Sequence, residues 1–218
     1  MAGPLDRECA ALVEQLRQRC PQVLPAEPLP PGRPGEPVPV DVQHARILIT
    51  TALRQAVSLD AGGRLPATDA GLPGVVVWTD GVGALAVEVA KVGVETADGE
   101  VGFVVPVRCD QLPQQRGTVR VSFTVGTPER PTGLLAATAR RPAGPRIVVD
   151  HWGEALTALC WRAVLDAAAG VAAATGRDHD GSPLVVTALT ATRAGLQVLP
   201  QARHPFDRVG PGRAVRTR

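Results

Sequence analysis

The stretch VGFVVPVRCDQLPQQRGTVRVSFTV, residues 101–125, decides the fold. In its first part, over 101–107, and again over 119–125, valine and phenylalanine alternate with smaller or polar residues. A period of two is typical of β-strands that bury one face and leave the other in water. We therefore expect each part to form a strand at the edge of one hydrophobic core.

Turn residues extend this pattern to a meander. Asp80-Gly81 and Asp98-Gly99 each separate two apolar segments, and such dipeptides are strong hairpin signals. Connections this short join antiparallel strands, because a parallel crossover needs a dozen or more residues. The other expected strands span 75–79, 85–95, 133–140 and 146–150, which makes about six strands with the two above.

Two details refine the strands. The alternation changes phase between Val89 and Val92, which predicts a bulge near Ala90 and Lys91. Pro106 has no N–H to donate, so its part of the strand should lie at an edge or a bulge.

Helices flank the strands. Asp41 is a plausible N-cap for a helix that ends at Gly62-Gly63, and Asp150 for a long helix that ends at Gly176. A hairpin over 184–190 and 194–199 closes the chain. The predicted fold class is α+β: an antiparallel meander of about six strands, a long helix packed across it and a closing C-terminal hairpin.

The N-terminus has a separate character. Residues 1–20 predict a short amphipathic helix, and residues 21–40, with eight prolines from Pro21 to Pro39, predict a linker that is neither helix nor sheet. At roughly 3 Å per residue the linker could hold the helix as far as ~60 Å from the α+β domain, residues 41–200. The apolar stripe of the helix, which needs a partner surface, consists of Leu5, Cys9, Leu12, Val13 and Leu16.

Composition and charge exclude several classes of protein. Apolar residues make up 44% and charged residues 20%, as in a globular protein. The formal charge of +2 comes from a flexible tail, residues 201–218, with five arginines and one acid, so nucleic-acid binding by the whole domain is disfavoured. Four cysteines without CxxC spacing, no secretory signal and no uninterrupted apolar span indicate a cytoplasmic protein that does not use a membrane.

Few residues are candidates for catalysis or metal binding. Asp178-His179-Asp180 and the pair Asp150 and His151 carry ligand or acid-base groups, but their spacing matches no metal signature, and a helix of about 24 residues separates them by ~35 Å. Cys109 and Cys160 are expected to be core thiols. We expect no catalytic residue, metal or cofactor. The three tryptophans, expected mainly in the core, are Trp78, Trp152 and Trp161.

The sequence thus favours a non-catalytic structural or adaptor component of a larger protein assembly, docked through its N-terminal helix to a protein partner or to its own oligomer. One alternative is an enzyme, or a protein that binds a small molecule or an acyl group, with its pocket between the sheet and the long helix. A second alternative is a nucleic-acid accessory protein that uses the basic tail.

Overall fold

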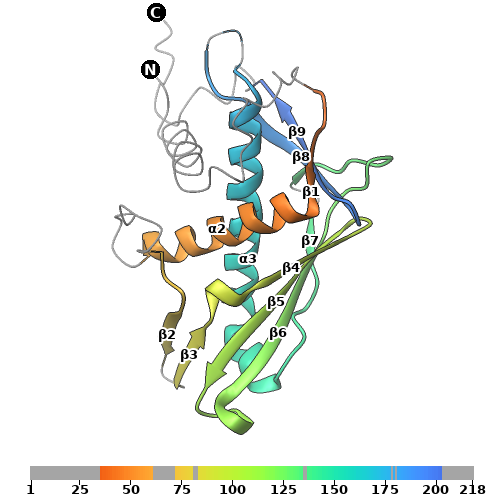
Figure 1. The fold of residues 1–218 in the computed structure, drawn as a ribbon. Coiled ribbons are helices and arrows are strands. Elements are labelled where there is room, and N and C mark those ends of the chain that lie inside the picture. Colours follow the sequence, from red (N-terminus) through yellow and green to blue (C-terminus); the bar gives the residue numbers. More distant parts are fainter. Residues whose placement is uncertain are drawn as a thin grey trace, which may run out of the picture.

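The computed structural model describes residues 35–60, 72–80, 83–134, 137–177, 179 and 181–202. Within these residues the chain is α+β: a curled antiparallel sheet carries one long helix, and a second helix crosses the long one (Figure 1). The predicted helix over 1–20, most of the linker over 21–40 and the tail from residue 203 lie outside the described residues.

Two helices, nine strands and two short 3₁₀ turns make up the described part of the chain. The helices are α2 (Val42–Asp60) and α3 (Arg146–Thr175), and the 3₁₀ turns are η2 (Val89–Lys91) and η3 (Pro113–Gln115). The strands are β1 (Val38–Asp41), β2 (Val76–Asp80), β3 (Gly83–Val87), β4 (Gly93–Ala97), β5 (Glu100–Cys109), β6 (Arg116–Thr124), β7 (Thr138–Ala139), β8 (Val185–Thr192) and β9 (Gly195–Gln201).

The strands form two sheets. The larger one has six strands in the order β2-β3-β5-β6-β7, with β4 also paired to β5, and its pairs are antiparallel as the turn residues predict. The smaller one has the order β1-β9-β8 and contains the expected closing hairpin. Backbone hydrogen bonds from Gly99 to Ala191 and from Ala191 to Gly126, both 3.0 Å, join the two sheets.

The irregularity predicted near Ala90 and Lys91 is present, but it is a break that divides the expected second strand into β3 and β4 and not a bulge within one strand. The chain leaves the sheet after β3, makes the turn η2 at the predicted position, and returns as β4, so that both strands pair with the same neighbour, β5. Pro106 of β5 faces this break, where its carbonyl accepts a 3.0 Å hydrogen bond from the Glu88 N–H. In a strand the N–H and C=O of one residue point the same way, so the missing N–H of Pro106 also faces the break and costs no ladder bond.

The segment over 146–150 is not a strand. It forms the first turns of α3, which is 30 residues long, and Asp150 therefore lies inside the helix and does not cap it. Pro145 stands at the N-cap, and its carbonyl accepts hydrogen bonds from Val148 (2.9 Å) and Val149 (3.0 Å). The β-branched residues suggested a strand, but Val148 is buried in the core, and such tertiary packing overrides local propensity.

The strand expected over 133–140 is also reduced. Among the described residues of this segment, Thr138–Ala139, the two residues of β7, pair with the end of β6, and Gly133 instead forms an isolated bridge with Ala188 of β8. This segment therefore runs between the two sheets, and the large sheet ends in a very short edge strand.

The last residues of the predicted linker also differ from expectation. Residues Val38–Asp41 form β1, which pairs with β9, although the prolines predicted no sheet up to residue 40. Pro39 is tolerated because β1 is an edge strand with a neighbour on one side only. Asp41 then caps α2 as predicted: its carboxylate accepts hydrogen bonds from the N–H groups of Gln43 (2.9 Å) and His44 (3.0 Å).

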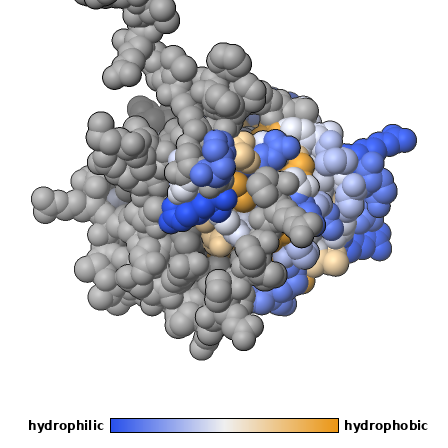
Figure 2. Space-filling view, turned by 90° about the horizontal axis from the view of Figure 1, so that it is seen from above, coloured by the Kyte–Doolittle hydropathy of each residue, from blue (hydrophilic) through white to orange (hydrophobic). Residues whose placement is uncertain are grey.

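The hydrophobic core lies between α3 and the concave face of the large sheet. Buried sheet residues such as Phe103, Val105 and Val121 face buried helix residues such as Leu156 and Ala163. By length and composition α3 could also span a bilayer, but half of its most apolar window is buried inside the protein, and a core helix passes the same test. Seen from above, hydrophobic residues lie near the centre of the described surface and hydrophilic ones gather on its right-hand side (Figure 2).

Candidate functional site

The five residues predicted to bind a partner, Leu5, Cys9, Leu12, Val13 and Leu16, lie outside the described residues. Their role therefore stays a prediction.

Asp150 and His151 do not form an acid-base dyad. The Asp150 carboxylate instead pairs with two arginines: Oδ1 lies 3.4 Å from Arg141 Nη2, and Oδ2 lies 3.2 Å from Arg146 Nε. His151 is exposed on the outer side of α3. Both carboxylate oxygens are thus taken up by arginines, so this end of the helix is built as a surface ion-pair network.

The loop after α3 offers no cation site among its described residues. Arg177 donates a 3.0 Å hydrogen bond from Nη1 to the Gly181 carbonyl, which closes the loop, and His179 is exposed. Asp178 and Asp180 lie outside the described residues. Across the described ranges, no group of three or more His, Cys, Asp or Glu side chains is placed to hold a metal ion.

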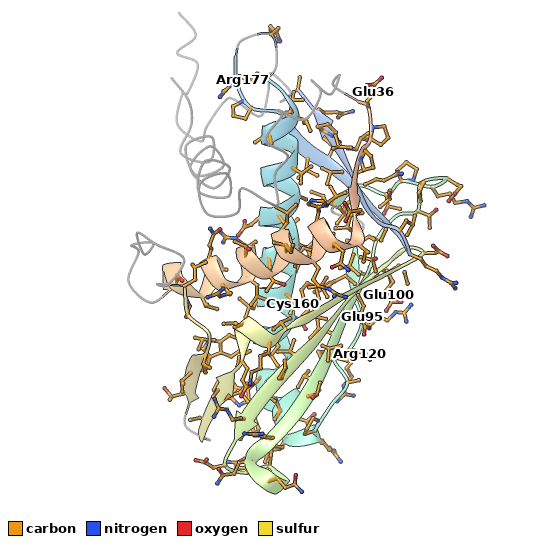
Figure 3. The ribbon with its side chains drawn as sticks, in the orientation of Figure 1. Glu36, Glu95, Glu100, Arg120, Cys160 and Arg177 are labelled. Atoms are coloured by element: carbon orange, nitrogen blue, oxygen red, sulfur yellow. The ribbon has the colours of Figure 1, made fainter. Side chains whose placement is uncertain are left out.

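The two described cysteines are core thiols, as predicted. Cys109 and Cys160 are both buried and free, and burial raises the pKa of the Cys160 thiol far above its usual value. Figure 3 shows Cys160 on the middle of α3, well away from Arg177 beyond the end of that helix. A thiol held in its neutral form is a weak nucleophile, so Cys160 is structural.

The surface that stands out lies along the exposed part of α3, where the helix meets the two end strands of the large sheet, β2 and β7. Two hollows run along this part, one on each flank of the helix, with volumes of about 510 Å³ and 420 Å³. The first hollow is lined by Ala56, Trp78, Trp152, Ala155, Ala158, Leu159 and Arg162. The second is lined by Phe123, Ala137, Ala139, Arg140, Arg141, Pro142, Glu154, Thr157, Ala158 and Trp161. We call these the first and the second hollow.

A ridge of small residues separates the hollows. Ala155 and Ala158 are exposed, and Ala158 lines both hollows. Because alanine side chains are short, another backbone can approach the axis of α3 closely at this ridge. We use the name α3 face for the ridge together with the two hollows.

All three tryptophans of the chain lie at this face. Trp78 of β2 packs on Trp152 with ring centroids 6.3 Å apart, beside the first hollow. Trp161 packs on Phe123 at 5.0 Å, in the second hollow. The three indoles are half-buried, with one side against the core and another at a hollow, so the expectation that they serve mainly as core residues holds only in part.

The placement of the tryptophans on α3 follows from helix geometry. Each residue advances about 100° around the axis, so Trp152 and Trp161, nine residues apart, project from opposite flanks of the helix. Ala155 and Ala158 fall in the arc between them. This signal was present in the sequence, but it could be interpreted only once the buried side of the helix was known.

Two of the arginines at the rim of the α3 face form ion pairs. Arg162 lies 2.7 Å from Asp166 at the rim of the first hollow, and Arg140 lies 3.1 Å from Glu100 at the rim of the second. Paired charges around an apolar centre are the usual make-up of a protein interface, where aromatic residues occupy the middle and polar residues the rim.

Comparison of the chain with models of protein families, with curated proteins and with solved structures gave no match. The assignment of a function therefore depends on the site itself.

Proposed function

We propose that the protein is a non-catalytic component of a protein assembly, and that the α3 face of one copy receives the predicted N-terminal helix of a second copy. The observation that carries the proposal is the pair of apolar hollows on the exposed side of α3, with every tryptophan of the chain beside them. Tryptophan is among the residues most enriched where protein partners bind most strongly.

Two features match the predicted helix to this surface. The helix has a stripe of five apolar residues and is too short to be stable alone in water, so it needs an apolar surface to bury against. The alanine ridge lets a helix approach closely, while the hollows accept larger side chains on both flanks. The chain reaches the described residues at Gly35, whose N–H bonds to the Pro200 carbonyl at 2.8 Å. The linker predicted over 21–40 would be long enough to extend to another molecule.

The packing favours this function over a pocket between sheet and helix. That interface is filled by core residues, among them Phe103, Leu156 and Val164, each with about 1% of its surface exposed or less. The two hollows open to the surface along the flanks of α3, and a small molecule would occupy one of them, whereas a protein segment would cover both. The nucleic-acid alternative depends on the tail from residue 203, outside the described residues.

The proposal is tested by native mass spectrometry of the full-length chain and of three variants. Ala158→Glu places a charge on the ridge, Leu12→Asp places one on the predicted helix, and Ala194→Glu, in the exposed turn between β8 and β9, is the matched control. We expect the wild type and the control to associate, and the first two variants to be monomers with unchanged far-UV circular dichroism.

A wild type that stays monomeric over the accessible concentration range would overturn self-assembly. If Ala158→Glu still forms the oligomer, the contact between copies does not involve the α3 face. A monomeric wild type whose tryptophan emission changes in Leu12→Asp would show that the helix docks on its own chain.

A further inference from the structure

A cluster of cations surrounds one nearly buried carboxylate on the outer face of the large sheet. Glu88, next to the break between β3 and β4, has a side chain that is 12% exposed. Its Oε2 lies 2.7 Å from Lys91 Nζ, and its Oε1 lies 2.9 Å from Arg108 Nε. The carboxylate therefore holds both cations in place with its two oxygens.

A third cation completes the cluster. Arg116 of β6 stands directly opposite Arg108 of β5 in the strand register, and both side chains are exposed on the outer face. Arg116 lines the same hollow as Glu88 and Arg108. The hydrogen bond from Lys91 and the charges of Lys91, Arg108 and Arg116 lower the pKa of Glu88. Three cations thus share one anion.

This arrangement leaves uncompensated positive charge. Like charges directly opposite each other on neighbouring strands destabilise a sheet, and one carboxylate cannot neutralise three cations. With Lys91, Arg108 and Arg116 against Glu88 the cluster carries a net charge of +2. A hollow of about 330 Å³ opens beside it, lined by Glu88, Pro106, Val107, Arg108, Arg116, Gly117 and Thr118.

We propose that this hollow binds a phosphate group, with Arg108 and Arg116 as its two principal ligands. A phosphate carries close to two negative charges at neutral pH, which matches the charge of the cluster. The planar guanidinium presents donors in a fork that fits two phosphate oxygens. Glu88 Oε1 pairs with Arg108 Nε and so orients the guanidinium of Arg108. The two terminal nitrogens of that guanidinium stay available for the ligand.

The volume of the hollow exceeds that of a phosphate ion, so the phosphate can be free or part of a larger organic molecule. Inorganic phosphate and phosphate monoesters share the chemistry that the arginines recognise. The site lies on the face of the sheet opposite α3, so its occupation is independent of the proposed assembly.

The test is isothermal titration calorimetry on the full-length protein at low salt, with inorganic phosphate in one arm and phosphoserine in the other. Arg108→Gln and Arg116→Gln should each weaken binding about tenfold or more, since a hydrogen bond to a charged group contributes about 1.5–3 kcal/mol. The matched control is Arg120→Gln, which removes an arginine from the same face, 3.9 Å from Glu95 (Figure 3). Its affinity should stay within about twofold of the wild type.

Each result of the titrations either supports or overturns the proposed phosphate site. Saturable binding of inorganic phosphate that is lost in both arginine variants supports the site, and tighter binding of phosphoserine assigns it to phosphate esters. Equal losses in all three variants would show that the ligand responds only to total charge, and the absence of saturable binding in both arms would also overturn the proposal.

Discussion

Replacing Gln55 by methionine should stabilise the protein. Gln55 lies on α2 with 3% of its surface exposed, and its Oε1 and Nε2 atoms have no hydrogen-bond partner in the described part of the chain. A buried donor or acceptor without a partner costs about 1–3 kcal/mol. Methionine has the same unbranched length and carries no group that needs a strong partner, so it fills the same space at a packing cost of less than about 1.5 kcal/mol.

The net gain in the free energy of unfolding should therefore be about 1–2 kcal/mol, which raises the melting temperature by several degrees for a chain of this size. Urea denaturation followed by circular dichroism measures it, with Gln43→Met as the control, because Gln43 is exposed on the same helix. We expect the control to change stability by less than about 0.5 kcal/mol. A loss of stability in Gln55→Met would refute the reasoning, since it would show that the amide has a partner that stabilises the native state.

Three further predictions concern a cap, a turn and a thiol. Asp41→Ala should cost about 1 kcal/mol in urea denaturation at neutral pH. Hydrogen bonds from the backbone N–H and the side chain of His44 lower the pKa of Asp41 below its usual 3.8. The stabilisation by the charged cap is therefore complete above pH 3.8, and the penalty should shrink as the pH falls through the lowered pKa. Gly195→Ala should cost about 2 kcal/mol or more, because φ is +140° and a Cβ would lie 2.1 Å from the Val40 carbonyl oxygen; thermal denaturation would contradict this if the variant melted like the wild type. Cys160 should resist iodoacetamide in the folded protein and react in urea, as peptide mapping by mass spectrometry can show; rapid native labelling would contradict its burial.

The meander could be predicted because its signals are local. Alternation over 101–107 and 119–125 marks the buried face of β5 and β6, and the change of phase at Ala90 and Lys91 locates the break between β3 and β4. The turn at Asp98-Gly99 follows from chemistry within a few residues, and Gly99 has the positive φ, +72°, that such a turn requires.

Other features depend on contacts between distant segments and could not be predicted from local patterns. The β-branched residues at 147–149 fit a strand equally well, and the local sequence alone does not show that they form the first turn of α3, with Val148 in the core. The α3 face also depends on a contact between distant segments. Trp78, which packs on Trp152, lies on a strand more than seventy residues earlier in the chain. The outer cation cluster likewise requires the register that sets Arg108 opposite Arg116.

The most direct test of the α3 face uses the tryptophans themselves. Because all three lie at this face, the intrinsic fluorescence of the protein reports on it alone. Acrylamide quenching should be measured over a range of protein concentrations, with the mass determined on the same samples. If the α3 face joins two copies, quenching decreases as the mass doubles. If the mass doubles while quenching stays the same, the copies meet elsewhere and the α3 face is not the interface.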